Sequence, residues 1–213
     1  MKIGILFDLD GTLLDTLQDL KNSVNYALNC YGCPERTLEE IRSFVGNGAR
    51  LLIARSLPGL ETDPDVDTVL ATFQQHYRAH TQVYTCPYPG ILEALKTVQS
   101  RWPIAIVSNK PDGAVRTLCA DYFGSVYARG ETADCPRKPA PDMLYQAMQA
   151  IGADSCIYVG DSEVDVTTAK NAGVKCLSVT WGFRDRAVLT EAGATHFCDD
   201  PHDLPATLEA MLQ

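Results

Sequence analysis

The hydrophobic pattern of the chain consists of short apolar runs separated by segments with helical periodicity. Nearly continuous apolar runs occupy residues 3–7, 104–107, 156–159 and 175–179, with weaker runs at 125–128 and 195–198. Runs of this length without polar alternation are typical of strands that are buried on both faces of a parallel sheet. The pattern therefore predicts up to six strands in one parallel sheet.

Between these runs, apolar residues recur at spacings of three and four, which places them on one face of a helix. The clearest such segment contains Met143, Leu144, Ala147, Met148 and Ile151. Because strand and helix patterns alternate through the C-terminal two thirds, the sequence predicts an α/β fold with a doubly wound, Rossmann-like parallel sheet.

The segment after the first apolar run has a different pattern, with helical stripes and no convincing strand. One stripe begins at Leu17, and Thr37 with Glu40 has the form of a capping box that opens a second helix. This pattern predicts a small helical domain inserted after the first strand. The predicted domains are an α/β core of residues 1–15 and 84–213 and a helical cap of residues 16–83.

The charge of the chain excludes some classes of partner. Acidic residues outnumber basic residues by 27 to 18, which gives a net charge of −9, and no run of Lys and Arg stands apart. A nucleic acid polymer would be repelled by this field, whereas a small anion can still bind beside a metal ion. No segment approaches the roughly 18 apolar residues of a membrane span. We therefore expect a cytoplasmic protein that acts on a small molecule, with no nucleic acid or membrane partner.

The eight cysteines raise the question of a metal or redox site. Cys30 and Cys33 form a single CxxC pair, but no second pair or neighbouring histidine accompanies it. A lone pair of this kind is a weak zinc signal, and it also lacks the preceding strand of a thioredoxin-like site. We interpret the cysteines as reduced thiols, as is usual in the cytosol.

Two acidic clusters follow predicted strands directly. Asp8 and Asp10 come after the first strand, and Asp161 and Asp165 come after the run at 156–159. The carboxyl ends of parallel strands share one edge of the sheet, which is where ligands bind in this class of fold. Close carboxylates are costly without a cation, and their oxygen atoms suit Mg²⁺.

Two further clusters carry groups that suit a phosphoryl ligand. Ser108 and Asn109 follow the run at 104–107 and offer a hydroxyl and an amide, and Lys138 offers a point charge in a proline-stiffened loop. Each cluster alone also has a structural interpretation as a helix cap or a turn. Four clusters in this order, each following a strand, are better explained by a common catalytic site.

The four clusters resemble the four motifs of the haloacid dehalogenase superfamily, in its phosphatase branch with a helical (C1-type) cap. The resemblance extends over the whole chain. Within the superfamily, the chain is most similar to the phosphoglycolate phosphatase group, on less specific cues. Those cues lie at residues 45–50, 108–111, 179–182 and 192–194.

The resemblance implies a role for each matching residue. Asp8 would be the nucleophile, and Asp10 the acid and then the base. Mg²⁺ would be held by the Asp8 carboxylate, the Asp10 carbonyl and Asp161, with Asp165 supporting the metal or pairing with Lys138. The resemblance assigns contacts with the phosphoryl group to Thr12, Ser108, Asn109 and Lys138.

Several questions remain open at this level. Arg50 in the predicted cap could bind a substrate carboxylate or could be a solvated helix residue, and Arg184 could line the entrance or cap a helix. The superfamily also includes phosphomutases of the β-phosphoglucomutase type, pyrophosphatases and nucleotidases. A non-enzymatic scaffold is disfavoured because four matched charged residues are intact. The dehalogenases lack a carboxylate at the position of Asp10, so its presence favours phosphoryl transfer.

Overall fold

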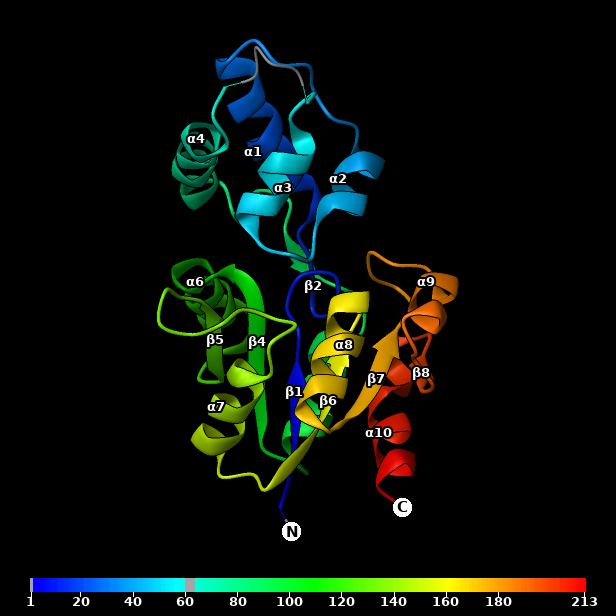
Figure 1. The fold of residues 1–213 in the computed structure, drawn as a ribbon. Helices are drawn as coiled ribbons and strands as arrows, with labels where there is room; N and C mark the ends of the chain where they lie inside the picture. The colour runs from blue at the N-terminus through cyan, green and yellow to red at the C-terminus, as the bar shows by residue number, and fades with distance from the viewer. Residues whose placement is uncertain (1, 60–63) are drawn as a thin grey trace. The chain divides into compact units, whose positions relative to one another are not determined.

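The computed structural model describes residues 2–59 and 64–213 (Figure 1). The chain divides into two compact units. The larger unit consists of Met1–Asp15 with Pro87–Gln213, and the smaller unit is Thr16–Cys86. Within the described ranges, no helix combines the length and the apolar character that crossing a membrane would require.

A six-stranded parallel sheet, counted over the described residues, forms the centre of the larger unit. Its strands are β1 (Ile3–Phe7), β4 (Ile104–Pro111), β5 (Tyr127–Glu131), β6 (Ser155–Gly160), β7 (Lys175–Val179) and β8 (Phe197–Cys198). The strand order is β5-β4-β1-β6-β7-β8. After β1, the chain adds β4 and β5 on one side of it, and then crosses over to add β6, β7 and β8 on the other side. The carboxyl end of β1 is therefore a topological switch point, where ligands bind in doubly wound sheets.

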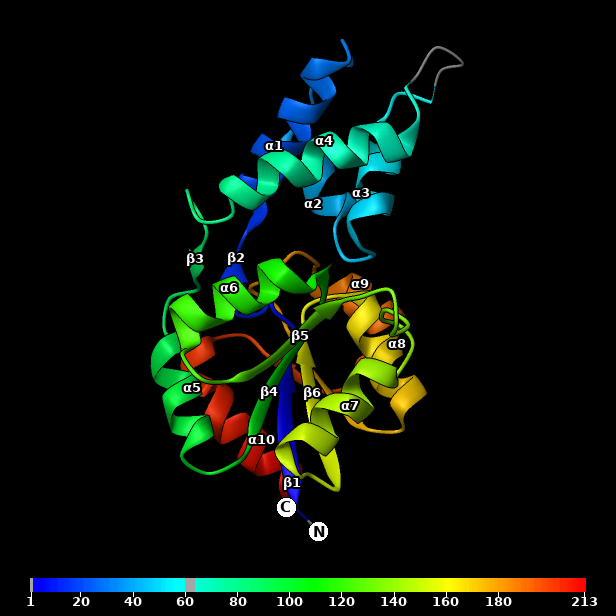
Figure 2. The ribbon, with the colours of Figure 1, turned by 90° about the vertical axis from the view of Figure 1, so that its left-hand side faces the viewer.

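Helices cover both faces of this sheet, which confirms the predicted doubly wound fold (Figure 2). One face packs against α5 (Ile91–Gln99), α6 (Asp112–Phe123) and α10 (Leu204–Leu212). The other face packs against α7 (Asp142–Ile151) and α8 (Glu163–Ala172). The short helix α9 (Arg186–Glu191) and the 3-10 turn η1 (Pro201–Asp203) flank β8 in the sequence.

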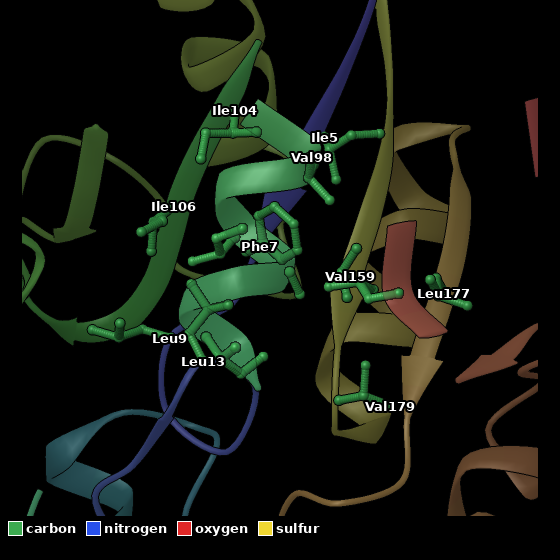
Figure 3. Close-up of a cluster of buried hydrophobic side chains, with 14 of the residues drawn as sticks. Ile5, Phe7, Leu9, Leu13, Val98, Ile104, Ile106, Val159, Leu177 and Val179 are labelled. Atoms are coloured by element: carbon green, nitrogen blue, oxygen red, sulfur yellow. The ribbon is translucent and has the colours of Figure 1, made fainter. Parts of the chain in front are cut away.

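Alternate residues of the strands separate into two apolar layers. Ile5 and Phe7 of β1 join the layer beneath α5, where Figure 3 shows them near Val98, and Leu6 joins the layer beneath α7. This separation follows from the two-residue period of a strand. Since both layers are closed to solvent, β1 is apolar throughout and its first available polar position is Asp8, just beyond its end.

The smaller unit contains four helices among the described residues. They are α1 (Leu17–Cys30), α2 (Leu38–Phe44), α3 (Ala49–Ser56) and α4 (Val66–Ala79). The predicted capping box is confirmed, because Thr37 and Glu40 exchange side-chain and backbone hydrogen bonds at the start of α2. Cys30 is the last residue of α1, and neither it nor Cys33 is in a disulfide.

A buried carboxylate ties together the two ends of the smaller unit. Asp19 of α1 accepts hydrogen bonds from the backbone amides of Val83, Tyr84 and Thr85 and from the Thr85 hydroxyl. The short strands β2 (Leu14–Asp15) and β3 (Cys86–Pro87) form a two-stranded sheet where the chain passes between the units. The outgoing and returning segments are therefore fixed to each other by hydrogen bonds.

Candidate active site

Asp8 lies at the switch point, immediately after β1. The backbone amide of Asp8 donates to the Val159 carbonyl at 2.9 Å, which continues the pairing of β1 with β6 by one residue. Oδ1 of its carboxylate accepts a hydrogen bond from the Leu9 amide at 2.7 Å and forms an ion pair with Lys138 at 2.9 Å. Among the described residues, no donor contacts the other oxygen, Oδ2. The side chain is therefore fixed through one oxygen and open at the other.

Lys138 is the centre of a buried polar network. Its Nζ lies 2.9 Å from Asp8 Oδ1, 2.9 Å from Asp165 Oδ1 and 2.8 Å from the Tyr158 hydroxyl. These three acceptors match the three N–H groups of an ammonium. Burial by itself would lower the pKa of Lys138, but Asp165 and Asp8 outweigh it and raise the pKa. Lys138 therefore remains a cation at every physiological pH.

Asp165 is fully occupied by protein donors. Its Oδ1 accepts from Lys138 and from the Tyr158 hydroxyl at 2.8 Å, and its Oδ2 accepts from the Ser162 amide and hydroxyl at 3.1 and 2.6 Å. Although burial acts to raise its pKa, Lys138 and these hydrogen bonds hold the pKa below its ordinary value. Asp165 is thus an ionised anchor for Lys138 and has little capacity left for a further ligand.

Asp161 is oriented by two donors from other loops. The Thr12 hydroxyl donates to Oδ1 at 3.0 Å, and the Phe183 amide donates to Oδ2 at 2.7 Å. Gly182 is required for this approach, because a Cβ there would lie 2.3 Å from the Gly11 carbonyl oxygen and 2.4 Å from the Asp161 Cβ. The backbone on both sides therefore fixes where the carboxylate lies.

The acidic cluster has the composition of a divalent cation site. Asp8, Asp161 and Asp165 each place one carboxylate oxygen within 4.8 Å of the others. Three carboxylates and the single ammonium of Lys138 leave the cluster two negative charges in excess. Burial, with repulsion from Asp165, raises the pKa of Asp161 to about 7, and burial also raises the pKa of Asp8 well above its ordinary value. A hard cation would relieve this excess charge, and because the oxygens of Asp165 are occupied, Asp8 and Asp161 would be its carboxylate ligands.

The end of β4 delivers three polar side chains to the site through an irregular turn. The register between β4 and β5 shifts between Val107 and Pro111, where four steps along β4 match two along β5. Asn109 donates to the Lys138 carbonyl at 2.9 Å and accepts from the Lys138 amide at 2.8 Å, and the Ser108 hydroxyl accepts from the Lys110 amide at 3.3 Å. Asn109 thus holds the loop that carries Lys138.

Asp10 forms a second charged pair at this edge. Lys110 Nζ lies 2.8 Å from Asp10 Oδ1 and 2.9 Å from Oδ2, and both side chains are largely buried. Asp10 follows β1, and Lys110 lies in β4. The edge therefore holds two lysines, each bonded to a carboxylate that follows β1.

The comparison with protein families identifies this arrangement. A model of the haloacid dehalogenase-like hydrolases matches residues 5–179, which include all four motifs. The chain belongs to this family. The resemblance inferred from the four motifs is thereby confirmed.

Relatives of this haloacid dehalogenase-like hydrolase match it over nearly its full length. It is 34% identical to phosphoglycolate phosphatase 1 of Pseudomonas aeruginosa, over 94% of the chain and 77% of the relative. It is 36% identical to the phosphoglycolate phosphatase of Cereibacter sphaeroides, over 95% of the chain and 90% of the relative. The crystal structure of a predicted phosphoglycolate phosphatase from Lactobacillus delbrueckii subsp. bulgaricus has a TM-score of 0.90 and 35% identity, covering 98% and 99% of the two chains.

In this family member, eight of the candidate residues belong to the larger unit. They are Asp8, Asp10, Thr12, Ser108, Asn109, Lys138, Asp161 and Asp165. The other candidates form ion pairs elsewhere. Arg50 of the smaller unit pairs with Asp67 at 2.8 Å, and Arg184 pairs with Glu163 at 2.8 Å.

Sequence reasoning did not assign a role to two residues that belong to the site. Tyr158 lies within an apolar run, and the hydrophobic pattern gives no sign that its hydroxyl takes part in the site. Lys110 directly follows Ser108 and Asn109, and its place in that polar triplet was the available signal. Both residues are buried and both bond a carboxylate of the site.

Proposed function

We propose that this hydrolase is a Mg²⁺-dependent phosphatase that cleaves a small phosphate monoester, with phosphoglycolate as the first substrate to test. The observation that carries the proposal is the state of Asp8, which is fixed through Oδ1 and has no donor on Oδ2 among the described residues. A carboxylate held in this way suits nucleophilic attack. The names of the relatives from Pseudomonas and Cereibacter support phosphoglycolate as the substrate.

In the proposed reaction, Asp8 and Asp10 act in sequence. Oδ2 of Asp8 attacks phosphorus, the bond from phosphorus to the leaving oxygen breaks, and that oxygen takes a proton from Asp10. Water then attacks the aspartyl-phosphate and gives its proton to Asp10, and the bond to Asp8 breaks with its electron pair returning to the carboxylate. Phosphate and an alcohol are released, and both side chains regain their starting forms.

The same residues account for the charge of the phosphoryl group. Lys138 contacts Asp8, so its positive charge would attract a phosphoryl oxygen, which would replace one of the three present acceptors of the ammonium, and the Ser108 hydroxyl can donate to another oxygen. Thr12 orients Asp161 in the structure, and Asn109 holds the Lys138 loop through its backbone. We therefore propose positioning roles for these two residues in addition to the predicted phosphate contacts.

Asp8, the Asp10 carbonyl and Asp161 would hold the Mg²⁺. The ion would offset the repulsion between the attacking carboxylate and the anionic phosphate. The excess negative charge of the cluster and the raised pKa of Asp161 both support this assignment, because a bound cation would offset the charge and favour the ionised carboxylate.

The test is phosphate release from a panel of esters with and without Mg²⁺, beside an Asp8→Asn variant. The panel contains phosphoglycolate, pyrophosphate, sugar phosphates and nucleoside monophosphates, so the largest kcat/KM selects among the phosphatase, pyrophosphatase and nucleotidase alternatives. Asp142→Asn, a helix residue outside the network, is the matched control. We expect Mg²⁺-dependent release that Asp8→Asn abolishes and Asp142→Asn retains.

Three outcomes would contradict parts of this proposal. No release from any ester would refute the hydrolase function, and isomerisation of a sugar phosphate without release would favour the phosphomutase alternative. Release that persists in Asp8→Asn would instead refute the nucleophile. Arg50 remains a predicted substrate contact, to be tested by comparing the KM for phosphoglycolate of Arg50→Ala with that of the wild type.

A further inference from the structure

Lys110 and Asp10 form an ion pair that the proposed chemistry does not yet explain. The ammonium contacts both carboxylate oxygens of Asp10, at 2.8 and 2.9 Å. The Lys110 side chain is 2% exposed, whereas that of Asp10 keeps 14%. Lys110 is therefore enclosed by protein, and Asp10 is the member of the pair that is accessible to solvent.

The backbone that carries Lys110 is fixed by several close contacts. Its amide donates to the Ser108 hydroxyl, and the register shift in β4 directs this segment out of the regular ladder. Gly130 of β5 allows the close approach, because a Cβ there would lie 2.5 Å from the Lys110 carbonyl oxygen. Asp112, the second residue after Lys110, accepts from the Gly130 amide at 2.9 Å. The fold therefore holds Lys110 in one place.

Burying a lysine here is not explained by stability. A buried ion pair seldom stabilises a protein more than apolar residues of similar size would. Cys119 of the apolar core lies near Lys110 and Asp10. Burial, with a smaller contribution from Asp10, raises the pKa of its thiol to about 12, as expected in an apolar environment. An apolar side chain at position 110 would suit this environment, so the charge calls for another explanation.

We infer that Lys110 is a positioning residue that holds the Asp10 carboxylate where it exchanges protons with the leaving group and with water. This inference rests on the proposed function, in which Asp10 is the acid and then the base. In the ionised form of Asp10, which acts as the base, the ammonium contacts both oxygens and fixes the carboxylate in rotation as well as in position. In the protonated form, which acts as the acid, the ammonium keeps its contact with one oxygen, and the protonated oxygen faces the leaving group. Proton transfer depends strongly on such alignment, because the donor must lie within hydrogen-bond reach of the departing oxygen.

A direct contact between Lys110 and the phosphoryl group would make a different prediction. Loss of a residue that binds the phosphoryl group would lower kcat/KM for every ester, because all of these substrates share that group. A residue that acts through Asp10 matters most when the leaving oxygen needs a proton, as in an alkyl phosphate. It matters little for 4-nitrophenyl phosphate, whose leaving group departs as a stabilised phenolate. The dependence on leaving group therefore separates the two roles.

The experiment is a double-mutant cycle of Lys110→Met and Asp10→Asn in the Mg²⁺-loaded enzyme, with Lys170→Met as the matched control because Lys170 is exposed on α8. The measured quantity is kcat/KM, which reports the steps up to phosphoryl transfer to Asp8. For an alkyl phosphate we expect Lys110→Met to lower it about 10- to 100-fold, within the range of acid catalysis. For 4-nitrophenyl phosphate we expect a loss below about threefold, and in the Asp10→Asn background Lys110→Met adds less than about twofold.

Other outcomes would overturn the inference. Equal losses on both esters would indicate phosphate binding or a damaged fold, and additive losses in the cycle would show that Lys110 does not act through Asp10. No loss at all would make the pair irrelevant to catalysis. If the wild type releases no phosphate from either ester, the proposed function fails and this inference fails with it. An active wild type with an additive cycle overturns the inference alone.

Discussion

The hydroxyl of Tyr158 provides a sharp test of the buried network, because it can be removed without changing the shape of the side chain. Tyr158 is fully buried in β6, and its hydroxyl accepts from Lys138 and donates to Asp165, each at 2.8 Å. Tyr158→Phe keeps the ring and its packing, so no cavity forms. The variant leaves one N–H of the buried ammonium without an acceptor and removes one of the four donors to Asp165.

The expected cost follows from these two lost hydrogen bonds. A hydrogen bond to a charged group contributes about 1.5–3 kcal/mol, and an unpaired buried donor cannot be compensated by water. Since both bonds share one hydroxyl, their effects are coupled, and we expect the free energy of unfolding to fall by about 2–4 kcal/mol. For a chain of this size the melting temperature would fall by about 5–15 °C. Looser orientation of Lys138 would lower kcat/KM about tenfold, which corresponds to about 1.4 kcal/mol.

Thermal and urea denaturation followed by circular dichroism, with phosphate release from phosphoglycolate, would measure both effects. Tyr145→Phe is the matched control, since Tyr145 is half exposed on α7. An unfolding free energy within about 0.5 kcal/mol of the wild type would refute the reasoning, because it would mean that the hydroxyl takes no part in holding Lys138. A loss of activity without a loss of stability would also contradict it.

Three further predictions concern the metal cluster and the smaller unit. Gly182→Ala should displace Asp161 and raise the Mg²⁺ concentration for half-maximal activity at least about tenfold, whereas Gly113→Ala, in open space on α6, should not. Burial raises the pKa of Asp161 to about 7 and also raises the pKa of Asp8, so at lower pH Mg²⁺ must displace protons from its proposed ligands. Mg²⁺ titrations of activity should therefore show an affinity that strengthens as the pH rises from 6 to 8. Asp19→Ala should remove the carboxylate that accepts from three backbone amides and lower the free energy of unfolding by about 2–4 kcal/mol in urea denaturation.

The hydrophobic pattern predicts the bounds of a strand correctly where all of its buried side chains are apolar. The predicted run at residues 3–7 coincides with β1, because every residue after its start is buried among apolar neighbours. The run at 104–107 stops short of β4, which continues to Pro111. Ser108, Asn109 and Lys110 are polar and yet nearly as buried as the strand before them. A pattern that equates burial with apolar residues cannot find side chains buried for their polar contacts.

The positions of the candidate residues followed from strand ends, but their partners did not. The sequence placed Asp165 near the metal or Lys138, and the structure shows its oxygens occupied by four donors from Lys138, Tyr158 and Ser162. The two Ser162 donors follow the Ser-x-x-Asp capping-box spacing at the start of α8, whereas the contacts with Lys138 and Tyr158 depend on side-chain rotamers and on the fold, which no spacing rule contains. Arg50 illustrates the opposite limit, since its ion pair with Asp67 joins α3 and α4 and cannot be read from either helix alone.

The exposure of the four carboxylates separates two kinds of role. The Asp165 side chain is 0% exposed and the residue Asp161 is 1% exposed, and both are held by several fixed donors. The side chains of Asp8 and Asp10 retain 11% and 14% exposure, and each forms an ion pair with a buried lysine. Reacting groups must reach the substrate, whereas groups that orient a metal or a lysine function best when closed off from water. The fold thus places two carboxylates at the surface of the site and two beneath it, and it connects the layers through Lys138.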